Sequence, residues 1–350
     1  MSKWDESRAD RPGLSVVMVT HDSAAALPRS LPALRAELRP GDELIICDNA
    51  SRDGTVELVR ELAPIAAIAE PGANLGFSTG SNLAAARATR ELLLFLNPDN
   101  VVAEGFRDAI ELPLLEDRGW AAWQGLVTAE GGATLNSLGG VVHFTGIAWA
   151  GGAGRSHALA PAGPSEVPFA SGACLAIRRE AWKRLGGFSA SYFLYHEDTD
   201  VGLRLWLAGH RSGIEPRARC DHDYEFAKGP HKWRYLERNR WATIVRTYPP
   251  RLLLLVAPAL LATELALLVV AATGGWLREK LRANAEVVRW LPRLLRERRA
   301  IQAEARIDAA EFARACLTPD LDSEYLGRAS RALLLRTLLR AYWRLVLRLL

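Results

Sequence analysis

Short apolar runs alternate with helical stretches in about the first hundred residues of this 350-residue chain. The runs have the composition of buried strands and cover residues 14–20, 43–47, 65–69 and 92–97. The intervening stretches with helical character cover residues 24–38, 54–63 and 80–90. Parallel strands have to be joined by long crossovers, which are usually helices, so the alternation predicts βαβ units and a parallel sheet. We therefore expect an α/β fold.

Two of the predicted strands end in polar residues that carry a carboxylate. The second run leads into Asp48, and the fourth leads into Asn97-Pro98-Asp99. Open α/β sheets bind their ligands beyond the carboxyl ends of the strands, so both carboxylates are candidates for a binding site. An aspartate at a strand end is also a common turn former, and that alternative stays open for each of them.

A glycine-rich segment, residues 71–82, lies between these two strand ends and leads into an alanine-rich helical stretch. Glycines at a loop-to-helix junction let the backbone approach a ligand and leave N–H groups for anionic oxygens. The spacing of the glycines matches neither the P-loop nor the dinucleotide fingerprint. A tight turn before a helix explains the segment equally well.

The densest group of acids consists of Glu197, Asp198 and Asp200, directly after an aromatic-rich segment. One carboxylate is enough to cap the helix that is predicted to follow. Three carboxylates crowded against aromatic residues raise the pKa of one member, which favours a proton acceptor. The cluster is therefore a candidate for catalysis as well as for capping. Arg204, one helical turn after Asp200, is expected to pair with an acid rather than with a substrate.

Taken together, these segments resemble the family 2 glycosyltransferases and, within them, the rhamnosyltransferase-like branch. The resemblance spans roughly residues 14–247. The residues that carry it are, in order, Val17–Ser23, Cys47–Ser51, Asn74–Phe77 with Gly80 and Asn82, Leu96–Asp99, and Ala170–Cys174 leading to Glu197–Asp200. It implies the GT-A fold, a nucleotide-binding α/β sandwich.

The resemblance implies an inverting transferase that moves a sugar from a nucleotide-diphosphate sugar to a lipid-linked or polysaccharide acceptor in cell-envelope glycan synthesis. By resemblance Asp198 is the general base, and Asp99 binds Mg²⁺ or Mn²⁺. The usual Asp-x-Asp pair is Asn97-Pro98-Asp99 here, and His222 is expected to complete the metal site. The implied nucleotide and substrate contacts are Thr20, Asp22, Asp48, Asn74, Gly76, Phe77, Asn82, Asn97, Gly172 and Glu197.

The identity of the donor sugar stays open. The branch suggests dTDP-rhamnose, but UDP-galactofuranose or another nucleotide sugar would leave the same motifs. A non-catalytic nucleotide-sugar-binding assembly subunit at the membrane is the competing class, and loss of Asp99 or Asp198 would have favoured it. A nucleotidyltransferase would be expected to have a glycine-rich N-terminal loop with basic residues, whereas residues 20–23 are Thr-His-Asp-Ser.

The composition changes in the middle of the chain. Residues 120–170 are rich in glycine and poor in helical periodicity, so we expect irregular strands and loops lying over the site. Residues 229–247 predict an amphipathic helix that closes the domain. The sequence thus predicts a catalytic domain over residues 1–248 and a helical membrane-associated region over residues 249–350.

Residues 252–273 are apolar except for Glu264 and are long enough to span a bilayer. Pro258 and Glu264 suit a simple membrane span poorly. Residues 278–350 contain 16 Lys and Arg against 9 Asp and Glu, and a single span would export this basic tail against the positive-inside tendency. A re-entrant or surface-lying pair of helices fits better.

The last segment has a charge pattern of its own. Arginines recur every four residues at Arg336, Arg340, Arg344 and Arg348, with leucines and aromatic residues between them. This pattern predicts a basic amphipathic helix suited to anionic lipid headgroups. The alternative is a helix that packs on its own domain or forms a homo-oligomer.

The four cysteines have no metal-ligand spacing, which favours buried thiols and a reducing compartment. The N-terminal residues 1–8 are polar, so we expect no secretory signal peptide. The expected location is the cytosolic face of the cytoplasmic membrane, with a membrane surface as partner and no nucleic acid.

Overall fold

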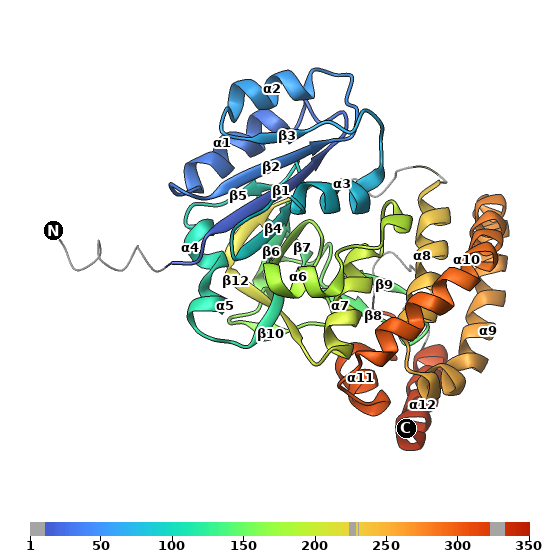
Figure 1. The fold of residues 1–350 in the computed structure, drawn as a ribbon. Helices are drawn as coiled ribbons and strands as arrows, with labels where there is room; N and C mark the ends of the chain where they lie inside the picture. Colours follow the sequence, from blue (N-terminus) through green and yellow to red (C-terminus); the bar gives the residue numbers. More distant parts are fainter. Residues whose placement is uncertain (1–10, 224–228, 230, 323–332) are drawn as a thin grey trace.

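A mixed ten-stranded sheet runs through the molecule in the order β10-β12-β6-β11-β4-β1-β2-β3, with β5 paired to β12 and β7 to β6 (Figure 1). The computed structural model describes residues 11–223, 229, 231–322 and 333–350, so the N-terminal segment 1–8 lies outside the described residues. The strands are β1 (Leu14–Thr20), β2 (Glu43–Asp48), β3 (Ala67–Ala69), β4 (Leu92–Leu96), β5 (Val101–Val102), β6 (Trp120–Ala129), β7 (Thr134–Ser137), β10 (Ser165–Glu166), β11 (Cys174–Arg178) and β12 (Arg211–Asp221).

The predicted parallel units are confirmed. β1 pairs in parallel with β2 and β4, and β2 pairs in parallel with β3. The crossovers contain α1 (Leu27–Glu37), α2 (Thr55–Leu62) and α3 (Gly76–Ala85). The prediction for the third helix, residues 80–90, was displaced: α3 begins at Gly76, because the glycine-rich segment packs on Phe193 and the Ser78 N–H donates to the Phe193 carbonyl at 3.2 Å. Apolar periodicity does not report such a tertiary contact.

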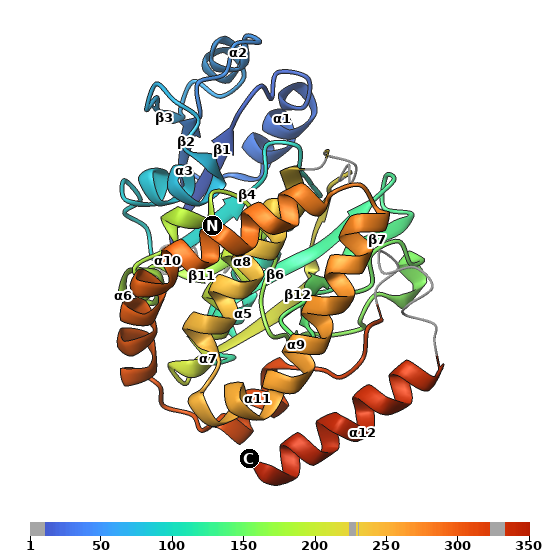
Figure 2. The ribbon, with the colours of Figure 1, turned by 90° about the vertical axis from the view of Figure 1, so that its right-hand side faces the viewer.

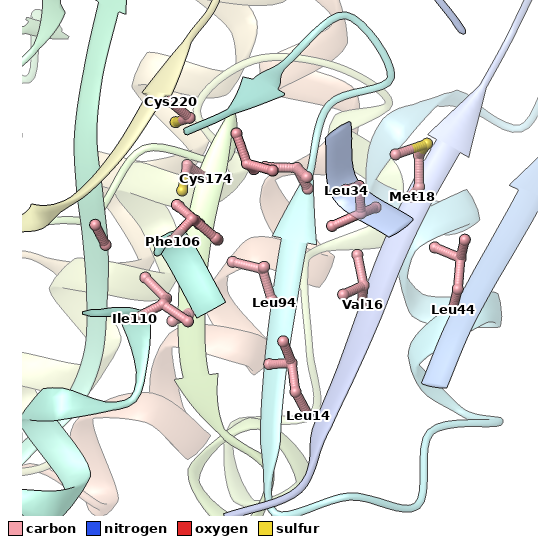
Figure 3. Packing of buried hydrophobic residues seen from close by; sticks show 14 of the residues in the cluster. Leu14, Val16, Met18, Leu34, Leu44, Leu94, Phe106, Ile110, Cys174 and Cys220 are labelled. Carbon is pink, nitrogen blue, oxygen red and sulfur yellow. The ribbon is translucent and has the colours of Figure 1, made fainter. Parts of the chain in front are cut away.

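Helices cover both faces of the sheet. On one face, α1, α2 and α4 (Phe106–Ile110) pack on the even-numbered side chains of β1, a core that Figure 3 shows around Val16, Leu94 and Phe106. On the other face, α3, α6 (Arg179–Leu185) and α7 (Glu197–Leu207) pack on Val17 and Val19. The alternation of side chains along a strand produces these two cores. The short helix α5 (Leu112–Leu115) follows α4.

The expectation of irregular structure throughout residues 120–170 was wrong for β6. This strand has ten residues, lies between β11 and β12, and is buried over nearly its whole length. A strand covered on both faces has no polar alternation, and Gln124 and Thr128 are accommodated in it by hydrogen bonds. The rest of the segment includes a separate hairpin of β8 (Gly140–Val142) and β9 (Ala148–Ala150) and a 3-10 turn at His157–Leu159.

The sheet brings several strand ends to one edge. The parallel strands β1, β2 and β4 end there. Because β11 is antiparallel to both β4 and β6, and β12 is parallel to β6, the strands β6 and β12 also end there and β11 begins there. This edge therefore collects Asp48, the segment Asn97–Asp99, Gly172 and His222.

The C-terminal helices form a layer on one side of the sheet domain (Figure 2). They are α8 (His231–Thr247), α9 (Pro250–Thr273), α10 (Leu277–Ala303), α11 (Ala309–Cys316) and α12 (Leu333–Leu349). Their apolar core includes Tyr248, Leu252 and Phe312, and it is continuous with Leu203 and Trp206 of α7 and with Phe144 of the β8–β9 hairpin.

The helix α8 does not have the expected exposed polar face. Its charged residues Glu237, Arg238 and Arg240 are buried. Glu237 pairs with Arg240 at 2.9 Å and with Lys280, while Arg238 pairs with Glu286 of α10 at 3.1 Å. These charged residues therefore form ion pairs inside the helical layer and are not exposed at its surface.

In the described part of the chain, α9 is the one helix long and apolar enough to cross a membrane; its most apolar window has a mean hydropathy of 2.5, and 11% of that window is buried. Glu264, the acid within it, points to the protein and pairs with Arg240 at 2.9 Å and with Lys280 at 2.7 Å. Leu254, Leu261 and Leu265 are largely exposed. From residue 252 to residue 273, the outward face of α9 therefore has no charged residue.

Candidate active site

Asp48, at the end of β2, ties together two loops that were predicted to hold the nucleotide. Its carboxylate accepts from the Thr20 hydroxyl at 2.8 Å and from the Ser51 N–H at 2.9 Å, and it is almost fully buried. The Asp22 N–H donates to the Ser51 hydroxyl at 2.9 Å. Because each carboxylate oxygen can accept more than one hydrogen bond, Asp48 can hold these loops and still accept from a ligand.

The glycine-rich segment is fixed to this region by Asn49. The Asn49 side chain accepts from the Leu75 N–H at 3.4 Å and donates to the Gly76 carbonyl at 3.2 Å. Asn74 accepts from the Gly76 N–H at 2.9 Å. Gly76 has a φ of 78°, and a Cβ there would lie 2.5 Å from the Phe193 carbonyl. Only glycine fits at this contact.

The end of β4 faces the end of β12. His222 Nε2 lies 3.1 Å from Asp99 Oδ1 and 3.4 Å from the Asn97 amide nitrogen. Asn136 of β7 donates to the His222 carbonyl at 2.8 Å, which fixes the backbone of the histidine. His222 is buried, whereas the Asp99 side chain is 42% exposed. The structure thus brings together the two residues predicted to bind a metal.

These two side chains fit a divalent cation only as part of its coordination. Within residues 11–223, 229, 231–322 and 333–350, no group of three or more His, Cys, Asp and Glu side chains is placed to hold a metal. Mg²⁺ is commonly bound through one or two carboxylates together with substrate phosphates and water. A site with Asp99 and His222 at its base and a diphosphate completing it matches that chemistry.

A strained loop precedes the acidic cluster. Phe193, Tyr195 and His196 all have positive φ values, of 66°, 71° and 65°, although none is glycine. Such conformations persist only where the surrounding structure imposes them. Asn239 of α8 does so: its amide nitrogen donates to the carbonyls of Tyr192, Leu194 and Tyr195 at 3.0, 3.0 and 2.7 Å. The buried α8 helix therefore sets the direction in which α7 begins.

Asp198 lies in the first turn of α7, with its carboxylate oriented by backbone N–H groups. Gly172 donates to Oδ2 at 3.0 Å and Thr199 donates to Oδ1 at 2.7 Å. Burial nevertheless raises the pKa of Asp198. Burial and the neighbouring Asp198 charge raise the pKa of Glu197 well above its ordinary value. Glu197 is 6% exposed, and its Oε2 has no hydrogen-bond partner among the described residues. Two adjacent carboxyl groups with raised pKa values suit proton transfer.

Asp200, the third acid, has a different environment. It accepts from Arg204 at 2.7 Å and also pairs with Arg246. Burial opposes its ionisation, but the two guanidinium groups outweigh burial and lower the pKa of Asp200. The predicted pairing of Arg204 with an acid is confirmed. Asp200 therefore anchors α7 to α8 and stays ionised, while Asp198 and Glu197 face the open space.

That space is a cavity of about 380 Å³ at the edge of the sheet where β4 and β12 end. Seven of the predicted site residues line it: Phe77, Asn97, Asp99, Gly172, Glu197, Asp198 and His222. The other six are Thr20, Asp22, Asp48, Asn74, Gly76 and Asn82, and they are not part of its wall. A larger hollow near Arg11 and Arg178, at the opposite edge of the sheet, contains none of the predicted site residues.

Asn82 differs from the other predicted contacts because its amide is occupied by the protein. Asn82 Nδ2 donates to the Phe188 carbonyl at 2.9 Å, and its Oδ1 accepts from the Phe188 N–H at 3.0 Å. The side chain thus clamps α3 to the turn after α6. Phe188 in turn packs against Phe77, with ring centroids 5.7 Å apart. Asn82 therefore positions Phe188, which packs against the cavity-lining residue Phe77.

Sequence reasoning missed the far wall of the cavity. Trp149 of β9 and Lys232, Trp233, Leu236 and Arg240 of α8 form it. Asn136 and Asn239, which position His222 and the strained loop, were missed as well. The only signals were general: residues 120–170 were expected to lie over the site, and the helix of residues 229–247 was expected to close the domain. These residues meet the motifs across long stretches of chain, so their individual roles could not be predicted.

The fold is that of the GT-A glycosyltransferases. A crystal structure of GalNAc-T7 with UDP, GalNAc and Mn²⁺ matches with a TM-score of 0.56 and 15% sequence identity, over 69% of this chain and 49% of that one. Residues 15–186 of this chain match the family described as Glycosyl transferase family 2.

Two relatives come from bacteria. The N-acetylglucosaminyl-diphospho-decaprenol L-rhamnosyltransferase of Mycobacterium tuberculosis is 28% identical over 255 residues, which cover 66% of this chain and 83% of the relative. The O-antigen biosynthesis protein RfbC of Myxococcus xanthus is 29% identical over 226 residues, covering 60% of this chain and 17% of that protein. These matches confirm the resemblance to the family 2 glycosyltransferases and to their rhamnosyltransferase-like branch.

Proposed function

We propose that this glycosyltransferase moves a sugar, with inversion, from a nucleotide-diphosphate sugar to a lipid-linked acceptor. The observation that carries the proposal is that Asp198 and the Asp99–His222 pair line the same cavity. Inversion requires a base that accepts the proton of the acceptor hydroxyl as that hydroxyl attacks the anomeric carbon. Asp198 fits this role, because two backbone N–H groups hold its carboxylate in place at the cavity wall.

The leaving diphosphate needs its growing negative charge neutralised, and a divalent cation, Mg²⁺ or Mn²⁺, supplies that chemistry when bound. Asp99 and His222 would hold it, and Asn97 and Asn136 keep His222 in position. Thr20, Asp22 and Asp48 form the pocket assigned to the nucleotide. Asn74 and Gly76 shape the loop beside that pocket.

For donor and acceptor we propose rhamnose and a lipid-linked sugar diphosphate. Support comes from the mycobacterial relative, whose name specifies transfer of L-rhamnose to N-acetylglucosaminyl-diphospho-decaprenol. The match covers 83% of that protein. A role in cell-envelope glycan synthesis at the cytosolic face of a membrane follows for this chain as part of the proposal. The four cysteines are free and buried, which suits a reducing compartment.

We further propose that residues 249–350 attach the catalytic domain of residues 1–248 to the membrane surface. The outward face of α9 is apolar, and α12 exposes leucines such as Leu334 and Leu338 as well as Arg344 and Arg348. Arg340 pairs with Asp320 at 2.6 Å, so it contributes less to the basic stripe than the sequence predicted. An apolar face with neighbouring arginines suits an anionic lipid surface.

The test is a panel of nucleotide sugars with Mn²⁺. Thermal shift identifies the donor, and the same donor is then incubated with a prenyl-diphosphate-linked N-acetylglucosamine. A glycosylated product of inverted anomeric configuration is expected. Donor binding without transfer to any glycan acceptor would favour the non-catalytic binding subunit instead.

A further inference from the structure

We propose that the cavity between the β8–β9 hairpin and α8 is the acceptor subsite. It takes the sugar-diphosphate head of a lipid-linked acceptor, and the lipid chain lies along the exposed face of α9. This inference rests on the proposed function and adds the residues that recognise the acceptor.

The position of the cavity favours the acceptor over the donor nucleotide. The residues assigned to the nucleotide, among them Thr20 and Asp48, do not line the cavity. The cavity instead extends from Asp198 to the hairpin and α8, where Trp149 and Trp233 are part of the wall. An attacking hydroxyl has to reach the base from the side opposite the leaving diphosphate, and this is the space available next to the base.

The far wall has the chemistry of a sugar-diphosphate site. Trp149 and Trp233 offer flat apolar surfaces with a polar N–H, as sites for partly apolar ligands commonly do. Lys232 adds a buried cation, and a cation of this kind pairs strongly with phosphate oxygens. Arg240 and Glu237 also lie in the wall, but they bind each other, and Arg240 donates to Glu237 and Glu264 at 2.9 Å each. This pair therefore shapes the wall, and its charges are already compensated within the protein.

The same wall is continuous with the apolar face of α9. Trp233 stacks on Trp276, which follows α9, with ring centroids 5.0 Å apart. From there the exposed apolar face of α9 begins with Val269 and Leu265 and continues to Leu261. Figure 2 shows α8 and α9 side by side on the same face of the molecule. An acceptor with its head in the cavity therefore has an apolar surface for its chain within reach.

A buried ion network holds α9 in place beside the cavity. Glu237 and Arg240 of α8, Glu264 of α9 and Lys280 of α10 contact one another in this network. It contains two acids and two cations, so it is balanced, and Lys280 is fully buried. Because Glu264 is turned inward here, the outer face of α9 has no acid. Such a face suits a hydrocarbon chain better than a protein partner, whose interfaces include hydrogen-bonding groups.

The experiment compares two acceptors that share a head group. One is N-acetylglucosaminyl diphosphate linked to a prenol, and the other carries a methyl cap in place of the prenol. Trp233→Ala is expected to raise the KM for both acceptors at least tenfold, with the donor Kd unchanged within twofold. In detergent solution without a bilayer, where membrane attachment plays no part, the double variant Leu261→Gln, Leu265→Gln is expected to raise the KM for the prenyl acceptor at least fivefold and that for the capped acceptor less than twofold. Leu159→Gln, an exposed leucine far from α9 in sequence, is the matched control and should change neither.

Three outcomes would overturn the inference. A weaker donor Kd with unchanged acceptor KM in Trp233→Ala would assign the cavity to the donor. Equal effects of the α9 double variant on both acceptors, or no effect on either, would remove the lipid chain from α9. Equal binding of labelled capped acceptor to wild type and to Trp233→Ala in equilibrium dialysis would remove Trp233 from the subsite, even if no transfer occurs. Absence of transfer by the wild type alone would instead contradict the proposed function. Trp149→Ala carries the same expectations where Trp233→Ala does not fold.

Discussion

Replacing Asn239 by alanine removes the residue that holds the strained loop before Asp198. The substitution deletes an amide whose two N–H groups are shared among the carbonyls of Tyr192, Leu194 and Tyr195, and whose oxygen accepts from Arg238 Nε at 3.0 Å, equivalent to about three hydrogen bonds. Asn239 itself is fully buried in α8, and it contacts the loop from a distance of more than forty residues in sequence. Arg238 still donates to the Tyr192 carbonyl at 2.7 Å, but the substitution removes the Asn239 hydrogen bonds to Leu194 and Tyr195, beside the positive φ values of Phe193, Tyr195 and His196.

The magnitude follows from the contacts. A net contribution of about 1 kcal/mol for each hydrogen bond predicts a loss of about 3 kcal/mol in the free energy of unfolding. Part of this loss is offset, because each residue in a sparsely populated conformation stores on the order of 1–3 kcal/mol that relaxation releases. If about 3 kcal/mol is needed to restore the loop in the transition state, kcat falls by roughly 100-fold. The donor Kd should change less than twofold, because the nucleotide pocket is formed by other loops.

The assay combines urea unfolding with steady-state kinetics. Thr247→Val is the matched control on the same helix: Thr247 is buried, and its hydroxyl donates to the Thr243 carbonyl at 2.8 Å. It should lose about 1 kcal/mol of stability and keep its kcat. An Asn239→Ala enzyme that is destabilised but has the kcat of the wild type would refute the reasoning, since the loop would then not position the base.

Further predictions concern the metal, the pH dependence and the membrane. Transfer should stop in EDTA and return with Mn²⁺ or Mg²⁺, whereas Asp99→Ala should not be rescued by added metal; full activity in chelator would contradict the metal site. Burial raises the pKa of Asp198 and the base acts only when ionised, so kcat should fall as the pH falls through a value above that of an ordinary aspartate. In Glu197→Gln the acid limb of the pH–rate profile should stay in place, because burial and the Asp198 charge raise the pKa of Glu197 well above its ordinary value, so Glu197 is already neutral where Asp198 ionises; a shift of the limb to lower pH would contradict this assignment. Arg344→Gln with Arg348→Gln should weaken sedimentation with anionic vesicles by roughly 30-fold at low salt, at about 1 kcal/mol for each arginine, and should leave binding to neutral vesicles unchanged.

The sequence was sufficient to predict the sheet wherever strands are buried and end in polar residues. β1, β2 and β4 are of this kind, and their parallel pairing places Asp48 and Asp99 at one edge. β6 was missed because Trp, Gly and Gln interrupt its apolar pattern. Its place between β11 and β12 depends on long-range pairing, which cannot be predicted from local strand propensity.

The site was predicted where motifs are short and local. Asp198 accepts from the Gly172 N–H at 3.0 Å, and the resemblance had named both residues for the site. The roles of Asn239 and Trp233 could not be read from the sequence, because each depends on how α8 packs against a loop that precedes it by about forty residues. The charges of α8 were misjudged for the same reason: their partners Glu264 and Lys280 lie on later helices.

The most direct test of the central claim pairs transfer with donor binding in Asp198→Asn. The amide has nearly the shape of the carboxylate but cannot accept the proton of the acceptor hydroxyl. Transfer to the lipid-linked acceptor is expected to fall by at least 100-fold, within the range that general-base catalysis contributes, while the donor Kd with Mn²⁺ stays within twofold of the wild type. Wild-type turnover in Asp198→Asn would remove this carboxylate from the mechanism, and loss of donor binding would make it a ligand-positioning residue instead.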